Sequence, residues 1–143
     1  MDLHNPLLQY LGVGLSEWTA GDCRFYLDVQ PRHLNRQASL QGGVIATLLD
    51  AACGYAGLTP ETEGAQDHAV TVMLTISYLA KVDSGRIFAA GRLTHMGRRL
   101  YFASGQVVTA ENKVIASAQG TFRRSQAEAA TSHRSDGTNK QYQ

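Results

Sequence analysis

The stretch HLNRQASLQGGVIATLLDAACGYAG, residues 33–57, decides how this chain folds. It begins as a polar run, passes through the pair Gly42-Gly43, and continues as an apolar segment. Apolar side chains then recur every three or four residues, which is the period of an α-helix with one buried face. These positions are Val44, Ile45, Leu48, Leu49, Ala52, Tyr55 and Ala56. We therefore predict a helix from about Gly42 to Gly57, where the glycine favours a stop.

The segments on both sides of this helix have the two-residue period of β-strands. Ahead of it we predict a short helix over residues 4–11, with Asn5 as N-cap, and two strands that turn at residues 20–22. Behind it we predict four strand segments, which cover residues 69–82, 85–96, 99–110 and 113–124. Alternation in the first of these places on one face Val70, Val72, Leu74, Ile76 and Tyr78.

A single apolar helix must pack against another element to bury its apolar face, and a curved antiparallel sheet can provide that surface. The predicted class is therefore α+β, with a curved antiparallel sheet wrapped around one long central helix. The length of 143 residues favours a single domain, which we place at residues 1–124. Residues 125–143 are polar and rich in small side chains, so a disordered tail is expected.

Composition argues against several classes of partner. The net charge is +1, which gives no reason to expect nucleic acid or an acidic membrane as the main partner. The two cysteines, Cys23 and Cys53, have no metal-site or redox-pair spacing. No charged leader or membrane-length apolar run is present, so the cytoplasm is the expected location.

Asp50 is the one carboxylate in the predicted helix. Aspartate is a mediocre helix former, and burying it without a partner costs several kcal/mol. The residues that share its face at helical spacing are all small: Gly43, Ala46, Thr47, Cys53, Gly54 and Gly57. Such a face leaves a groove for a ligand or for a closely packed backbone. From the residues alone, Asp50 is either a site residue or a polar group satisfied by its neighbours.

The pair Gly42-Gly43 stands where the predicted helix begins. Amides of a first helical turn have no partner within the helix and carry the positive end of its dipole. A glycine there lets a substrate oxygen approach the backbone N–H, which is how a main-chain oxyanion hole is built. A tight turn between loop and helix would explain the same pair.

Residues 33–56 resemble the signature of hotdog-fold acyl-CoA thioesterases. The branch most similar to it contains the phenylacetate-pathway thioesterases and the Arthrobacter-type 4-hydroxybenzoyl-CoA thioesterase. That signature has an asparagine, then His-Gly-Gly, then an acid eight residues after the first glycine. Asn35, Gly42 and Asp50 keep this order and spacing, and the resemblance extends over residues 5–124. It implies the hotdog fold and hydrolysis of an acyl-CoA thioester.

The resemblance also implies roles for individual residues. Asp50 is expected to act as nucleophile or general base, and the Gly42 N–H is expected to hold the oxyanion. Asn35 is expected to orient water or the thioester, and Thr71, from the partner subunit, to place the attacking water. Gln41 stands where the family commonly has histidine, so it can donate a hydrogen bond but cannot titrate near neutral pH.

The remaining expectations concern the substrate and the assembly. We expect Gly43, Tyr55 and Met73 to contact the substrate. The turn Gly97-Arg98-Arg99 is expected near the nucleotide end of coenzyme A, where guanidinium groups pair with phosphates. The resemblance implies a dimer or a dimer of dimers with active sites at the subunit interface. No metal or separate cofactor is expected, because coenzyme A is part of the substrate.

Two other functions fit the same fold. A non-catalytic acyl-CoA binder is compatible with glutamine at position 41. A hotdog-fold hydratase needs a histidine a few residues after the acid, and the segment AACGYAG, residues 51–57, contains none.

Overall fold

The computed structural model describes residues 3–60 and 67–126. The helices are α1 (Pro6–Leu11), the 3-10 turn η1 (Pro31–His33) and α2 (Gly42–Ala56). The strands are β1 (Gly14–Thr19), β2 (Asp22–Val29), β3 (Asp67–Tyr78), β4 (Gly85–Met96), β5 (Leu100–Thr109) and β6 (Val114–Gln126). The predicted helices and all six predicted strands are therefore present, with ends shifted by a few residues.

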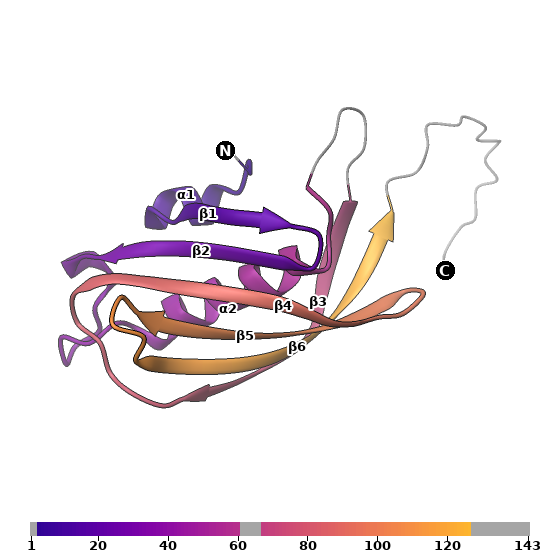
Figure 1. The fold of residues 1–143 in the computed structure, drawn as a ribbon. Coiled ribbons are helices and arrows are strands. Elements are labelled where there is room, and N and C mark those ends of the chain that lie inside the picture. Colours follow the sequence, from indigo (N-terminus) through magenta and orange to yellow (C-terminus); the bar gives the residue numbers. More distant parts are fainter. Residues whose placement is uncertain (1–2, 61–66, 127–143) are drawn as a thin grey trace, which may run out of the picture.

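The six strands form one antiparallel sheet in the order β1-β2-β4-β5-β6-β3. The sheet curves around α2, as Figure 1 shows, so the predicted α+β architecture is confirmed. Strand β1 lies at one edge of the sheet and β3 at the other. An edge strand presents backbone N–H and C=O groups that no neighbouring strand of the same chain uses.

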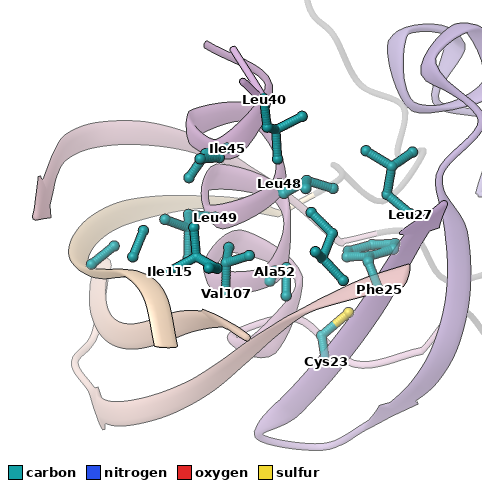
Figure 2. Close-up of a cluster of buried hydrophobic side chains, with 14 of the residues drawn as sticks. Cys23, Phe25, Leu27, Leu40, Ile45, Leu48, Leu49, Ala52, Val107 and Ile115 are labelled. Carbon is teal, nitrogen blue, oxygen red and sulfur yellow. The ribbon is translucent and has the colours of Figure 1, made fainter. Parts of the chain in front are cut away.

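The core lies between α2 and the concave face of the sheet. Leu48, Leu49 and Ala52 of the helix are fully buried. They pack with side chains from β2, β5 and β6, among them Phe25 and Val107 (Figure 2). Since a fully buried leucine contributes about 1.5–3 kcal/mol, this seam fixes the helix on the sheet.

Helix α1 is held against η1 by side-chain bonds. Arg32 Nη1 donates to the carbonyl of Tyr10 at 2.8 Å, and its Nη2 donates to the carbonyl of Leu11 at 3.2 Å. The buried ring of His33 brings its Nε2 within 2.8 Å of the same Leu11 carbonyl, while its Nδ1 accepts from the Gln30 N–H. These bonds place α1 beside the segment that leads into α2.

Side chains from the sheet satisfy the carbonyls at the end of α2. The Trp18 indole donates to Tyr55, the Tyr101 hydroxyl donates to Gly54, and Arg124 donates to Gly57. Gly57 is required by close approach, because a Cβ there would lie 1.9 Å from the Tyr101 ring. Its φ of −91° shows that it is not a left-handed cap.

The predicted alternation of β3 is wrong in one place. The register of β3 against β6 shifts between Thr71 and Met73, which is a β-bulge. The bulge turns Thr71 toward α2 and leaves Val70 and Val72 more than half exposed. Only Leu74 and Ile76, beyond the bulge, are partly buried against the core as predicted.

One prediction falls mostly on residues that the structure does not describe: of the tail expected at residues 125–143, residues 127–143 lie outside it. Strand β6 continues to Gln126, two residues beyond the predicted domain end. Among the helices of the described residues, none is long and apolar enough to cross a membrane.

Candidate active site

Asp50 and Thr71 form the centre of the candidate site. Asp50 lies in the third turn of α2, and the bulge in β3 aims Thr71 at it. The Thr71 hydroxyl donates to Asp50 Oδ1 at 2.6 Å. Our expectation that Thr71 comes from a partner subunit is therefore wrong, because the two residues meet within one chain.

A pocket of about 280 Å³ opens beside this pair. Helix α1 supplies one wall, α2 the floor, and β3 with β6 the opposite wall. Its lining residues are Asn5, Leu7, Leu8, Thr47, Asp50, Ala51, Gly54, Tyr55, Leu58, His68, Ala69, Thr71 and Phe122. The pocket thus combines one carboxylate with hydroxyl, amide and imidazole groups and with apolar side chains, a mixture that suits a small-molecule site.

The largest hollow, about 650 Å³, lies elsewhere, across the sheet strands. It is lined mostly by small polar side chains, and its only charged members are Asp22 and Arg92. Size alone would favour this hollow. We favour the smaller pocket because it holds an acid in hydrogen-bond contact with a hydroxyl.

The two thiols cannot serve as the nucleophile. Burial, followed by the charge of Asp50, raises the pKa of Cys53 to about 12. Burial, followed by Cys53, raises the pKa of Cys23 to about 12 as well. Because the thiolate is the reactive form, both cysteines are inert at neutral pH. The remaining acid–base side chains that line the pocket are Asp50, Tyr55 and His68, and Asp50 is the one bonded to Thr71.

The first turn of α2 carries free backbone donors. Gly42 is the first helical residue, and within the described part of the chain its N–H and that of Gly43 have no hydrogen-bond partner. The Tyr78 hydroxyl, at the end of β3, donates to the Gly42 carbonyl at 2.8 Å and fixes this turn. An anion or a developing oxyanion can bind at such a turn.

Gly42 and Asp50 do not act at one point within a single chain. Eight residues of helix separate them, which is about 12 Å along the axis. One thioester carbonyl cannot span that distance while it also receives a water activated by the acid. The two candidate groups therefore lie at separate places on the chain.

The other two expected catalytic residues precede α2 and do not line the pocket. The Asn35 carboxamide oxygen accepts from the backbone N–H groups of Gln37 at 2.8 Å and Ser39 at 3.1 Å, so it shapes the loop before α2. Gln41 is exposed and its side chain makes no capping bond. Both residues precede α2, and neither lines the pocket beside Asp50.

The expected substrate contacts do not all lie at the pocket. Tyr55 lines the pocket with Asp50, while Gly43 lies exposed at the helix start. Met73 is 58% exposed and outside the pocket, because the bulge turns it away from α2. Gly97 forms the β4–β5 turn, and the side chains of Arg98 and Arg99 are exposed there, also outside the pocket. No cluster of three metal-binding side chains exists among residues 3–60 and 67–126.

Sequence reasoning missed the contribution of α1 and the role of Tyr78. Leu7 and Leu8 reach the pocket from a helix that is more than forty residues from Asp50 in the chain. No local period signals such a contact. Alternation places Tyr78 on one face of the strand, but it does not show that the hydroxyl reaches Gly42, because that bond depends on how α2 crosses β3.

The match to known families decides what kind of domain this is. The family model described as the thioesterase superfamily matches residues 38–116, more than half of the chain. The chain belongs to the thioesterase superfamily. Its sheet and central helix are those of the hotdog thioesterase fold, as predicted. The narrower assignment to an Arthrobacter-type branch stays a prediction.

Known structures and a sequence relative agree with this thioesterase domain. The thioesterase HI1161 from Haemophilus influenzae superposes with a TM-score of 0.75 at 22% identity, over 84% of this chain and 82% of that chain. The PaaI protein of E. coli, from the phenylacetic acid degradation operon, gives a TM-score of 0.72 at 23% identity, over 83% and 88%.

A protein of Halobacterium salinarum, provisionally named an esterase, is 28% identical over 126 residues. The match covers 82% of this chain and 83% of that protein. Membership of the superfamily and this name support hydrolysis of an ester or thioester as the general activity.

Proposed function

We propose that this thioesterase domain hydrolyses acyl-CoA thioesters to a free acid and coenzyme A. The observation that carries the proposal is the Asp50–Thr71 pair, 2.6 Å apart at a pocket lined by both apolar and polar side chains. A carboxylate can activate water, and the pocket beyond it can hold an acyl group. Coenzyme A enters as part of the substrate, so the proposal needs no metal or separate cofactor.

The reaction follows from these groups. As general base, Asp50 takes a proton from a water molecule held with the help of Thr71, and the water oxygen attacks the thioester carbonyl. The carbonyl oxygen becomes an oxyanion, the C–S bond breaks, and the sulfur leaves as the thiol after it receives the proton. As nucleophile, Asp50 would instead form an acyl-enzyme anhydride that water hydrolyses. In a single turnover in ¹⁸O-water, the general-base route puts the label only in the product acid, whereas attack of water on the aspartyl carbonyl of the anhydride puts it in the Asp50 carboxylate.

We further propose that the oxyanion is held by Gly42 of a second copy of the chain. The 12 Å separation along α2 excludes the same chain, as argued above. Strand β3 offers the surface for pairing, since it is a sheet edge with exposed apolar side chains. Those more than half exposed in β3 or just after it are Val70, Val72, Met73, Tyr78 and Leu79.

Antiparallel pairing of two β3 edges would bring the halves of the site together. Thr71, near one end of β3, holds Asp50, and Tyr78, at the other end, holds Gly42. A two-fold axis near the middle of the strand places Thr71 of one copy across from Tyr78 of the other. Each Asp50 then faces a Gly42 N–H from the neighbouring copy, and the dimer has two equivalent sites. Pairing of such dimers into a tetramer remains part of the resemblance-based expectation.

Charge at the β3 edge should break this dimer. We expect the double change Val72→Lys with Met73→Lys to give a monomer, because lysine side chains would replace apolar ones on the pairing edge and charges on an edge strand oppose pairing. Mass from light scattering should fall to that of one chain, and hydrolysis should fall to near background. Tyr10→Lys, on the 75% exposed Tyr10 of α1, is the matched control and should stay dimeric and active. An active monomer would refute the shared site.

Thr71 should matter through its hydroxyl alone. Thr71→Val keeps the shape but removes the bond to a charged acceptor, and we expect kcat to fall about tenfold or more. Thr71→Ser should retain most of the activity. Steady-state kinetics with circular dichroism as a folding check make the measurement. Equal activity of the valine and serine variants would show that Thr71 acts only by packing.

A panel of acyl-CoAs tests the proposed function itself. Short, medium, long and aryl thioesters are incubated with the protein, and released thiol is followed with a chromogenic reagent. Hydrolysis of at least one thioester, abolished in Asp50→Asn, is the expected result. Tight binding of acyl-CoA without turnover would instead identify a binding protein, the alternative that glutamine at position 41 allows.

A further inference from the structure

We propose that Gly54 sets the size of the acyl group that this domain accepts. The inference rests on the proposed function, because it assigns the pocket beside Asp50 to the acyl group. Gly54 lies in α2, one turn after Asp50, and lines that pocket. By taking no space there, it leaves room for a compact acyl group that a larger residue would exclude.

Helix geometry gives no reason for a glycine at this position. Glycine is among the poorest helix formers. The described glycines with positive φ are Gly12, Gly21 and Gly85, so Gly54 is not needed for a left-handed conformation. It stands inside α2, two residues before the last helical residue, and not at the cap.

Packing gives no reason either. A Cβ at Gly91 would lie 2.2 Å from the Ala52 carbonyl oxygen, and one at Gly105 would lie 2.8 Å from the Cys53 sulfur. Those glycines are required by close contact. A Cβ at Gly54 would meet only Phe122, at 3.4 and 3.7 Å, which is close to ordinary contact. An alanine therefore fits the fold at Gly54.

The added carbon would take its space from the pocket. Its neighbour Phe122 is itself a lining residue, and it cannot retreat because it is buried and stacks on Tyr101 at 5.3 Å. The Tyr101 hydroxyl in turn holds the Gly54 carbonyl at 2.5 Å. With the helix and the aromatic wall both fixed, any side chain at Gly54 narrows the pocket between them.

The pocket defines the class of acyl group. Its volume of about 280 Å³ lies at the lower end of small-molecule sites, which begin at roughly 300 Å³. Its walls combine apolar side chains, among them Leu8, Leu58 and Phe122, with the polar side chains of Asn5, Thr47 and His68. This volume suits a compact acyl group of about one aromatic ring, and it is too small for a long fatty chain.

The test compares Gly54→Ala and Gly54→Val with the parent on three thioesters. For benzoyl-CoA and hexanoyl-CoA we expect kcat/KM to fall about tenfold in the alanine variant and further in the valine variant. For acetyl-CoA it should stay within about twofold. The melting temperature of the alanine variant should be equal or higher, because alanine favours helix. Palmitoyl-CoA should be poor with all three proteins.

Binding provides a readout that needs no turnover. In an Asp50→Asn background, titration calorimetry should show weaker binding of benzoyl-CoA after Gly54→Ala and unchanged binding of acetyl-CoA. If the parent hydrolyses no thioester, the proposed function fails. If the parent hydrolyses benzoyl-CoA and Gly54→Ala lowers kcat/KM equally for all substrates, or for none of them, the inference about Gly54 fails. The alanine variant decides this even if the valine variant does not fold.

Discussion

Asp50→Asn should lower kcat for acyl-CoA hydrolysis by about a thousandfold. The amide keeps the size of the carboxylate and can still accept from Thr71, so the pocket should keep its shape. It can neither take a proton from water nor attack a carbonyl, and loss of a general base typically costs a hundredfold to ten-thousandfold. Stopped-flow or steady-state release of thiol, with the best substrate of the panel, makes the measurement.

The matched control is Asp83→Asn, at an exposed aspartate far from the pocket. It should keep the parent rate and the parent melting temperature. Should Asp50→Asn hydrolyse thioesters as fast as Asp83→Asn, the carboxylate would have no part in catalysis and the proposed mechanism would be abandoned.

Gly42→Pro should lower kcat by about a hundredfold or more, because it deletes the backbone N–H that we assign to the oxyanion. Proline is well tolerated at the first position of a helix, where the N–H has no helical partner. The preceding Gln41 already has an extended backbone, with φ −64° and ψ 135°, which is the conformation that proline imposes on its neighbour. Circular dichroism should therefore show an intact fold.

Gly42→Ala separates the effect of losing the backbone N–H from the effect of adding a side chain. Its Cβ would lie 3.5 Å from the Tyr78 ring, an ordinary contact, and its N–H remains. We expect this variant to stay within a few-fold of the parent. If Gly42→Ala and Gly42→Pro lose activity equally, crowding at the helix start, and not the missing donor, is the cause.

Mixing the two inactive proteins tests whether the site is shared. In a dimer of one Asp50→Asn chain and one Gly42→Pro chain, one site receives a normal Asp50 and a normal Gly42. Statistical re-assortment should restore roughly a quarter of the parent activity. If both residues acted within the same chain, no mixed dimer would hold an intact site, and mixing would restore nothing.

Much of this fold is predictable from the sequence because its signals are local. The period of α2, the Asn5-Pro6 start of α1 and the Gly21 turn between β1 and β2 each act within a few residues. The spacing of Gly42 and Asp50 likewise shows both candidate groups. The same spacing, at the rise of an α-helix, also places them about 12 Å apart.

The rest depends on how distant segments meet. The bulge in β3 is visible only once β6 lies beside the strand, and it decides that Thr71, not Val70, reaches Asp50. The wall formed by α1 depends on Arg32 and His33, which hold the helix through its backbone carbonyls. Bonds of this kind leave no period in the sequence, so the wall formed by α1 could not be predicted, and Thr71 was expected at the site only through the family resemblance.

The side-chain bonds at the end of α2 have a consequence for motion. The last turn of a helix commonly frays, since its carbonyls face water and open independently of the rest. Here Trp18, Tyr101 and Arg124 come from three different strands, β1, β5 and β6, so unravelling that turn requires breaking its attachments to all three. Opening of this last turn is thereby coupled to the sheet, so the end of α2 that forms the floor of the pocket should open only together with the strands that hold it.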